Sequence, residues 1–200
     1  MGSRAAGYRG VFFAAGLCAL AGCGGQPTSE KLAIDAVPAS QAAPLAPTSM
    51  ALAAGGAFAP RQSAYANNLS PPLAWAAAPG AQSYAVVIED PDAEGGRPFV
   101  HWLIWNIPGD AVGLPEGVPL GQATATPPGA IQGMSDAHTP GYFGPHPPAG
   151  TGLHHYHVEL FALDQRLDLN ASAQLPQLEA AMQGHVLAKG VLVATYTAPK

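Results

Sequence analysis

Cysteine is scarce in this 200-residue chain, and so is charge. There are two cysteines, and charged residues make up 10% of the sequence. Both cysteines, Cys18 and Cys23, lie near the N-terminus, so no disulfide can join the parts of the chain that follow them. This excludes the small disulfide-stabilised scaffolds. Stability has to come from a hydrophobic core, which a folded portion of about 150 residues is long enough to form.

Basic residues are outnumbered by acidic ones. The chain has eight Lys and Arg against 13 Asp and Glu, a formal net charge of −5 with His neutral. Without Arg4 and Arg9, which belong to the leader described next, six basic residues remain and the net charge is −7. No run of Lys and Arg provides the positive surface that binds a phosphate backbone. We therefore expect no nucleic-acid partner.

The first 22 residues are typical of a secretory signal peptide. Arg4 and Arg9 give a positive start, and an apolar run follows from Val11 to Leu20. Small residues then precede Cys23, as they do at a cleavage site. The apolar run is too short for a comfortable transmembrane helix.

The end of this leader, Leu20-Ala21-Gly22-Cys23, resembles a bacterial lipobox. The resemblance implies cleavage before Cys23, lipidation of its thiol, and a protein tethered to a membrane rather than embedded in it. Gly24 in place of an Asp after the lipidated cysteine implies sorting to the outer membrane, facing the periplasm. The alternative is an ordinary signal peptide followed by an incidental cysteine.

Two further parts follow the signal peptide over residues 1–22. Residues 23–48 are mainly Ala, Pro, Ser and Gln from Gly24 onward, a composition that favours a flexible tether without secondary structure. Residues 49–200 then form the folded domain.

The folded part consists of short apolar runs separated by turn residues, which predicts an all-β-dominated antiparallel β-sandwich with one or two short C-terminal helices. Strands are expected over Leu73–Trp75, Tyr84–Ile88, Phe99–Ile107, His154–Leu163 and Val191–Ala198. With a period of two, Phe99, His101, Leu103, Trp105 and Ile107 share one face. A long irregular loop is expected from Gly109 to about Tyr142. One helix, capped by Ser172, carries Leu175, Leu178 and Met182 on one face and breaks near Gly184, with Gly190 at C′.

Histidines occur where turns rich in glycine and proline meet these strands. The stretch from Gly141 to Asp164 reads GYFGPHPPAGTGLHHYHVELFALD, and Asp90-Pro91-Asp92 precedes the strand that carries His101. Prolines stiffen such a loop and glycines let a ligand approach the main chain closely. This combination is typical of a small binding pocket.

These motifs resemble the phosphatidylethanolamine-binding protein family, in particular its bacterial Raf-kinase-inhibitor-like branch. The resemblance runs from about Ala57 to the C-terminus and includes NLSPPLAW, DPDA, GYFGPHPPAGTGLHHYH and GHVLAKG. It implies a β-sandwich that binds rather than catalyses, requires no cofactor, and holds a phosphate-type anion or a phospholipid head group. The implied ligand-binding residues are Asp90, Asp92, His101, Gly144, Pro145, His154 and Tyr156.

The chemistry of these residue types agrees with an anion pocket. Imidazoles donate hydrogen bonds to phosphate oxygens, most strongly when protonated, and exposed amides around Gly144 would add donors. Asp90 can hold a histidine tautomer or pair with an ammonium group. The pocket has no Arg or Lys, so we expect modest affinity that falls as pH rises through about 6.5.

Two alternatives belong to other classes. In one, the protein inhibits or scaffolds an unknown protein partner and its pocket is vestigial. In the other, His155, His157 and Glu159 alternate along one strand face and, with His146 or His138, bind zinc in a metal-dependent hydrolase.

Overall fold

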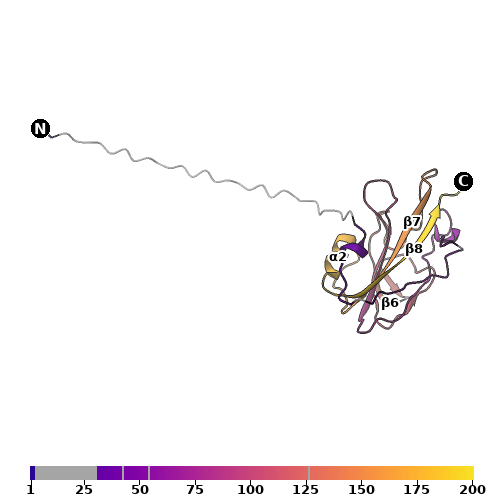
Figure 1. Cartoon of the computed structure of the whole chain (residues 1–200), viewed down its shortest axis with the longest axis horizontal. Helices are drawn as coiled ribbons and strands as arrows, with labels where there is room; N and C mark the ends of the chain where they lie inside the picture. Colours follow the sequence, from indigo (N-terminus) through magenta and orange to yellow (C-terminus); the bar gives the residue numbers. More distant parts are fainter. Residues whose placement is uncertain (3–30, 42, 54, 126) are drawn as a thin grey trace.

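The computed structural model describes residues 1–2, 31–41, 43–53, 55–125 and 127–200. The predicted signal peptide, apart from its first two residues, and the lipidation site Cys23 lie outside these residues. The described chain forms a six-stranded and a two-stranded antiparallel sheet with few helices (Figure 1). The predicted fold class is therefore confirmed.

The strands are β1 (Leu73–Ala74), β2 (Ser83–Asp90), β3 (Phe99–Pro108), β4 (Gly113–Leu114), β5 (Ala123–Ala125), β6 (Pro128–Gln132), β7 (Leu153–Leu163) and β8 (Val186–Thr197). The helices are α1 (Ala33–Ala36), the short 3-10 helix η1 (Pro60–Gln62) and α2 (Leu175–Met182). The large sheet has the order β5-β6-β3-β2-β7-β8, and β1 pairs with β4. Strands β4 to β6 lie in the stretch predicted to be one irregular loop, so that prediction is wrong in part.

The large sheet is covered on both faces, which explains why every residue of β2 is buried. One face packs in a first core with the residues around β1 and β4; its largest fully buried members are Tyr84, Trp102, Tyr142 and Tyr156. The other face packs in a second core with α1 and α2, which lie together against the sheet in Figure 1. Its largest members are Trp105, Phe161, Leu103 and Leu163.

A β-bulge at His101 decides where that side chain points. Ile88 of β2 pairs with Trp102 of β3, but the next residue, Glu89, pairs with Val100. His101 is therefore an extra residue in β3, and a bulge of this kind re-aims the side chain at its position. Its ring contacts Tyr156 of the first core, edge to face at 5.1 Å between centroids.

A second bulge lies near the end of the same strand. Tyr84 pairs with Ile107 while Val86 pairs with Ile104, and Asn106 has a φ of 58°. The prediction of one face for alternate residues from Phe99 to Ile107 is wrong for this reason. The members of the first core are Trp102, Ile104 and Ile107, whereas Val100, Leu103 and Trp105 belong to the second.

The predicted tether is also partly wrong. Residues 33–36 form α1, and Ala33 and Val37 are 0% exposed in the second core. Further along, the N–H of Leu45 donates to the carbonyl of Lys189 in β8, at 2.9 Å. From residue 31 onward, this segment is part of the folded domain.

The C-terminal elements differ from prediction at their ends. Helix α2 is capped by Gln174, which exchanges hydrogen bonds with the first turn, while the Ser172 hydroxyl pairs with Asn170. Gly190 is not a helix terminus but lies inside β8, where a Cβ would come 1.9 Å from the carbonyl oxygen of Leu45. No side chain larger than hydrogen fits at that close approach.

None of the helices in the described residues combines the length and the apolar character needed to cross a membrane.

Candidate ligand-binding pocket

A pocket of about 380 Å³ opens where β2, β3 and β7 meet the loops that follow β2 and precede β7. It is lined by Asp90, Ala93, Glu94, Phe99, His101, Asp136, Ala137, Phe143, His146, Pro147, Pro148 and His154. Three of the predicted site residues, Asp90, His101 and His154, are among them. Because β2 lies between β3 and β7 in the sheet, it brings residues that are distant in sequence to one end of the fold.

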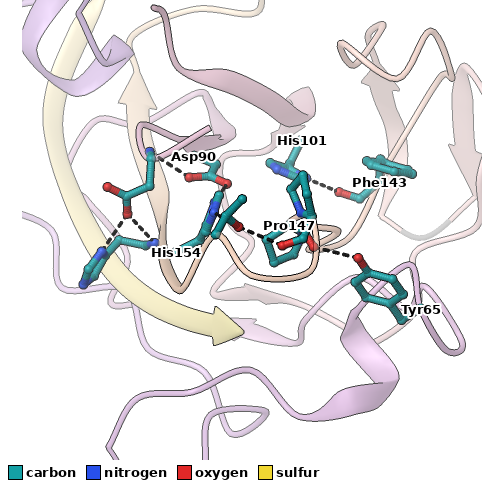
Figure 2. A network of polar contacts seen from close by, with 10 residues as sticks. Tyr65, Asp90, His101, Phe143, Pro147 and His154 are labelled. Atoms are coloured by element: carbon teal, nitrogen blue, oxygen red, sulfur yellow. Dashed lines mark hydrogen bonds and ion pairs between the residues drawn. The ribbon is translucent and has the colours of Figure 1, made fainter. Parts of the chain in front are cut away.

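His154 is held by hydrogen bonds at both ring nitrogens. Its Nδ1 lies 2.8 Å from Oδ2 of Asp90, and its Nε2 lies 2.9 Å from the hydroxyl of Thr151 (Figure 2). Both His154 and Asp90 are buried. A carboxylate only accepts, so Nδ1 carries a proton. Asp90 thus fixes the orientation and the Nδ1 proton of His154, which is one of the two roles expected of it.

Asp90 also organises the turn that follows β2. Its second carboxylate oxygen accepts a hydrogen bond from the N–H of Asp92, at 2.9 Å. A side chain that bonds the backbone two residues on is the usual device of an Asp in a turn. Both carboxylate oxygens of Asp90 therefore have partners within the protein.

His101 is buried and neutral. Its Nδ1 lies 2.7 Å from the carbonyl oxygen of Phe143, which can only accept, so Nδ1 carries the proton. Burial lowers the pKa of His101 from 6.5 to about 4, against the opposing effect of the Phe143 carbonyl. The expectation that His101 becomes a strong cationic donor near pH 6.5 is therefore wrong. Its Nε2 carries a lone pair, which accepts a hydrogen bond rather than donating one.

Tyr156 lies beneath the pocket rather than along its wall. Its ring packs against Phe58 and His101, and its hydroxyl is buried next to the carboxylate of Asp90. Burial, followed by the nearby Asp90 carboxylate, raises the pKa of this hydroxyl well above its usual value. Tyr156 therefore remains a neutral hydroxyl, and it supports His101 from below.

The Gly144-Pro145 segment does not supply the open amide that the sequence suggested. The N–H of Gly144 donates to Oδ1 of Asn68 at 2.7 Å, and a Cβ at Gly144 would lie 2.1 Å from the carbonyl oxygen of Gln62. Neither Gly144 nor Pro145 lines the pocket. Their role is to pack the loop closely against the chain around η1.

Asp92 likewise faces away from the pocket. Its Oδ2 accepts from the N–H of His155 at 2.8 Å and lies 2.7 Å from Nδ1 of the same residue. Partial burial alone would raise the pKa of Asp92, but the hydrogen bonds from His155 lower it. The pair joins the turn after β2 to the start of β7.

The apolar wall of the pocket was not predicted from the sequence. Phe99 and Phe143 flank His101, with ring centroids 4.8 and 5.9 Å from it. Pro147 and Pro148 continue this wall along the loop before β7. Figure 2 shows Pro147 between the His154–Asp90 pair and Tyr65, whose hydroxyl donates to the Pro147 carbonyl at 2.6 Å. The available signal in the sequence was the aromatic residues Phe99 and Phe143 in the two motifs that carry His101 and Pro147.

Two acidic residues of the pocket were also missed. Asp136 binds Arg97 through both carboxylate oxygens, at 2.7 and 3.1 Å, and accepts from the N–H of Val100 at 2.8 Å. Glu94 is exposed and has no hydrogen bond or ion pair within the described residues. Together with Asp90 they give the pocket three carboxylates, and no Lys or Arg lines it.

The alternative of a zinc site finds no support in the geometry. His155 is paired with Asp92, and Oε2 of Glu159 accepts from the N–H of Ile34 at 2.8 Å in the interior. Within the part of the chain that the structure describes, no three His, Cys, Asp or Glu side chains gather as metal ligands would.

Comparison with known proteins agrees with the fold. The family model described as "Phosphatidylethanolamine-binding protein" matches residues 48–197. The chain belongs to the phosphatidylethanolamine-binding protein family. A solved member, YbcL of Escherichia coli, superimposes with a TM-score of 0.71 at 27% identity, covering 78% of this chain and all of that one.

Two further relatives are similar in sequence. A UPF0098 protein of Methanothermobacter thermautotrophicus is 45% identical over 130 residues, covering 64% of this chain and 83% of the relative. LppC of Mycobacterium tuberculosis, whose name describes it as a candidate lipoprotein, is 34% identical over 188 residues, covering 89% of this chain and 90% of LppC.

Proposed function

We propose that this protein is a lipid-anchored binding protein whose pocket holds a phospholipid head group or a similar small phosphate-containing ligand. It acts by binding and not by catalysis. The observation that carries the proposal is the pocket itself, in which the fixed His154–Asp90 pair and the neutral His101 face a wall of aromatic and proline residues. Membership of the phosphatidylethanolamine-binding protein family supports the same ligand class.

The charges of the pocket favour a ligand that also carries an ammonium group. Three carboxylates line the pocket, no Lys or Arg does, and of the three only Asp136 has an Arg partner. A bare phosphate would therefore be disfavoured at neutral pH. Asp90 and Asp136 are engaged by partners within the protein, whereas Glu94 at the rim has none in the described chain. An ethanolamine-type head group would place its ammonium near Glu94 and its carbon chain against the apolar wall.

The signal peptide and Cys23 support a location at a membrane, where such head groups occur. Similarity to LppC over most of both chains supports lipidation. We propose that acylated Cys23 anchors the protein in the outer membrane, with the pocket in the periplasm. Changing Cys23 to Ser should move the protein from the membrane fraction to the soluble fraction, and mass spectrometry of the N-terminal peptide would show the acyl chains.

A titration followed by NMR tests the pocket. The probes are glycerophosphoethanolamine, which has both charges, dimethyl phosphate, which has only the negative one, and ethanolamine, which has only the positive one. We expect saturable shifts at His101 and His154, with glycerophosphoethanolamine binding about tenfold more tightly than either partial ligand. If dimethyl phosphate binds as tightly as glycerophosphoethanolamine, the pocket is a simple anion site instead.

Variants connect the binding to the pocket. Glu94→Gln should weaken glycerophosphoethanolamine but not dimethyl phosphate, because it removes only the partner of the ammonium. His185→Gln is a matched control, since His185 is exposed and pairs with Asp164 away from the pocket. If none of the probes saturates, the pocket is vestigial and the function lies in contacts with a protein partner.

Vesicles with and without phosphatidylethanolamine distinguish a membrane lipid from a soluble head group.

A further inference from the structure

We propose that His146, at the rim of the pocket, supplies the positive charge that holds the phosphate of the ligand, and that Tyr65 keeps its ring in position. This inference rests on the proposed function and names the residue on which anion affinity depends. The sequence suggested His101 and His154 for this role, and considered His146 only as a metal ligand.

The first step is to account for the ring nitrogens of the three pocket histidines. In His154 both nitrogens are engaged, by Asp90 and Thr151. In His101 the Nδ1 proton is donated to the Phe143 carbonyl, and the ring is too deeply buried to accept a second proton. Neither ring therefore has an N–H free to donate to a phosphate oxygen.

His146 differs from both. Its side chain is exposed at the pocket rim, and neither ring nitrogen has a hydrogen-bond partner in the described chain. The residue lies in the segment Pro145 to Pro148, where the other three residues are prolines and have no N–H. Its own N–H also makes no hydrogen bond to the described residues. His146 thus has one backbone donor and, when protonated, two ring donors.

Tyr65 holds this imidazole. The two rings are stacked, with centroids 4.1 Å apart and planes at 26°, and Phe143 lies on another side at 6.0 Å. The Tyr65 hydroxyl donates to the carbonyl of Pro147, the residue after His146, at 2.6 Å (Figure 2). One side chain therefore contacts both the ring of His146 and the backbone beside it.

The charged groups around the pocket agree with this assignment. The carboxylates that share the pocket with His146 are Asp90, Glu94 and Asp136, and its other titratable residues are His101 and His154. Asp136 is neutralised by Arg97 and Asp90 is paired with His154. Glu94 therefore remains as the unpaired anion of the pocket and His146 as its available cation. Opposite charges on the rim match the two ends of a zwitterionic head group.

The test measures affinity for dimethyl phosphate, a diester whose charge is constant over the pH range used, at about pH 5.5 and about pH 8. The wild-type protein should bind about tenfold more tightly at the lower pH, because the donor is then charged. His146→Gln should weaken binding about tenfold at pH 5.5 and leave it unchanged at pH 8. His185→Gln should behave as the wild type at both.

A second pair of variants tests the role of Tyr65. Tyr65→Phe keeps the stacked ring and should retain most of the pH dependence of dimethyl phosphate affinity. Tyr65→Leu removes the ring and should lose about half of the increase in affinity at low pH. The NMR titration of the His146 ring supplies an independent readout, because bound dimethyl phosphate should move its midpoint to higher pH.

The outcomes separate this inference from the proposed function. Wild-type binding whose pH dependence persists in His146→Gln would overturn the role of His146 and leave the pocket as a ligand site. Absence of saturable binding by dimethyl phosphate and glycerophosphoethanolamine in the wild type, at both pH values, would overturn both.

Discussion

Glu89 and Glu159 lie on the same face of neighbouring strands, two residues apart in register, and both accept hydrogen bonds from the first turn of α1. Val87 pairs with Glu159 and Glu89 pairs with His157, which gives the offset. Oε2 of Glu89 accepts from the N–H of Ala33, and Oε2 of Glu159 from that of Ile34, both at 2.8 Å. The second oxygen of each carboxyl group is buried without a hydrogen bond in the described chain. Two buried acidic groups thus fasten the segment that precedes the predicted domain.

This pair should make the protein less stable as pH rises. Burial raises the pKa of Glu89 from 4.5 to about 7 and that of Glu159 from 4.5 to about 9. Between pH 4.5 and the raised pKa of each glutamate, the folded state holds a proton on that group that the unfolded chain has released. The free energy of unfolding therefore falls with increasing pH. We expect a decrease on the order of a few kcal/mol from about pH 5 to about pH 9, measured by urea denaturation.

Glutamine variants provide the control for that pH dependence. Glu159→Gln keeps an oxygen for the N–H of Ile34 but does not titrate, so its stability should change much less over the same range. Glu94→Gln, at an exposed position, should follow the wild type. An unchanged pH dependence in Glu159→Gln would show that the buried pair is not responsible.

Removal of residues 31–48 should destabilise the fold by several kcal/mol. The deletion takes Ala33 and Val37 out of the second core and leaves Glu89 and Glu159 without their N–H partners, each a cost of about 1–3 kcal/mol. A fragment that begins at Lys31 should unfold at the same urea concentration as the mature chain. Equal midpoints for the fragments beginning at Lys31 and at Ser49 would contradict the expected role of α1.

Asp90→Asn should weaken binding of glycerophosphoethanolamine by about tenfold or more, because the amide no longer requires the Nδ1 proton of His154. The ring is then free to adopt the other tautomer or to turn. Nitrogen chemical shifts of the His154 ring report the tautomer directly. His155→Gln, which disturbs the neighbouring pair with Asp92 instead, is the matched comparison and should bind as the wild type.

His101 should not titrate between about pH 5 and about pH 8. Its pKa, lowered to about 4 by burial, means that the folded state takes up a proton only under more acidic conditions than the unfolded chain does. Below about pH 6.5 this residue therefore reduces stability as pH falls. Ring proton shifts of His101 that stay constant over this range would match the expectation, and a titration midpoint within it would contradict it.

Much of the sheet could be predicted from the sequence because the apolar runs of β2, β3 and β7 are long. The convergence of Asp90, His101 and His154 was expected from the motifs that carry them. The bulge at His101 could not be predicted, because it depends on how β3 pairs with β2. The hydrogen bond of the Gly144 amide could not be predicted either, because its partner Asn68 is 76 residues away in the sequence.

Helix α1 shows why composition alone can mislead. Its four residues have no capping side chain of their own, and the surrounding Ala and Pro residues are typical of a linker. The groups that hold it come from distant strands, with the Lys189 ammonium donating to the carbonyl of Val37 at 2.7 Å and the two glutamates at the other end. Only the assembled sheet brings these groups together.

The same segment closes one edge of the large sheet. The N–H groups of Ser40, Gln41 and Leu45 donate to β8 near its start, and residues 56–58 bond to Thr195 near its end. Open strand edges invite pairing between molecules, and here the open stretch is reduced to the region of Val191 and Val193. Where the proposed anchor crowds copies of the protein on a membrane, a covered edge would hinder neighbouring molecules from joining their sheets.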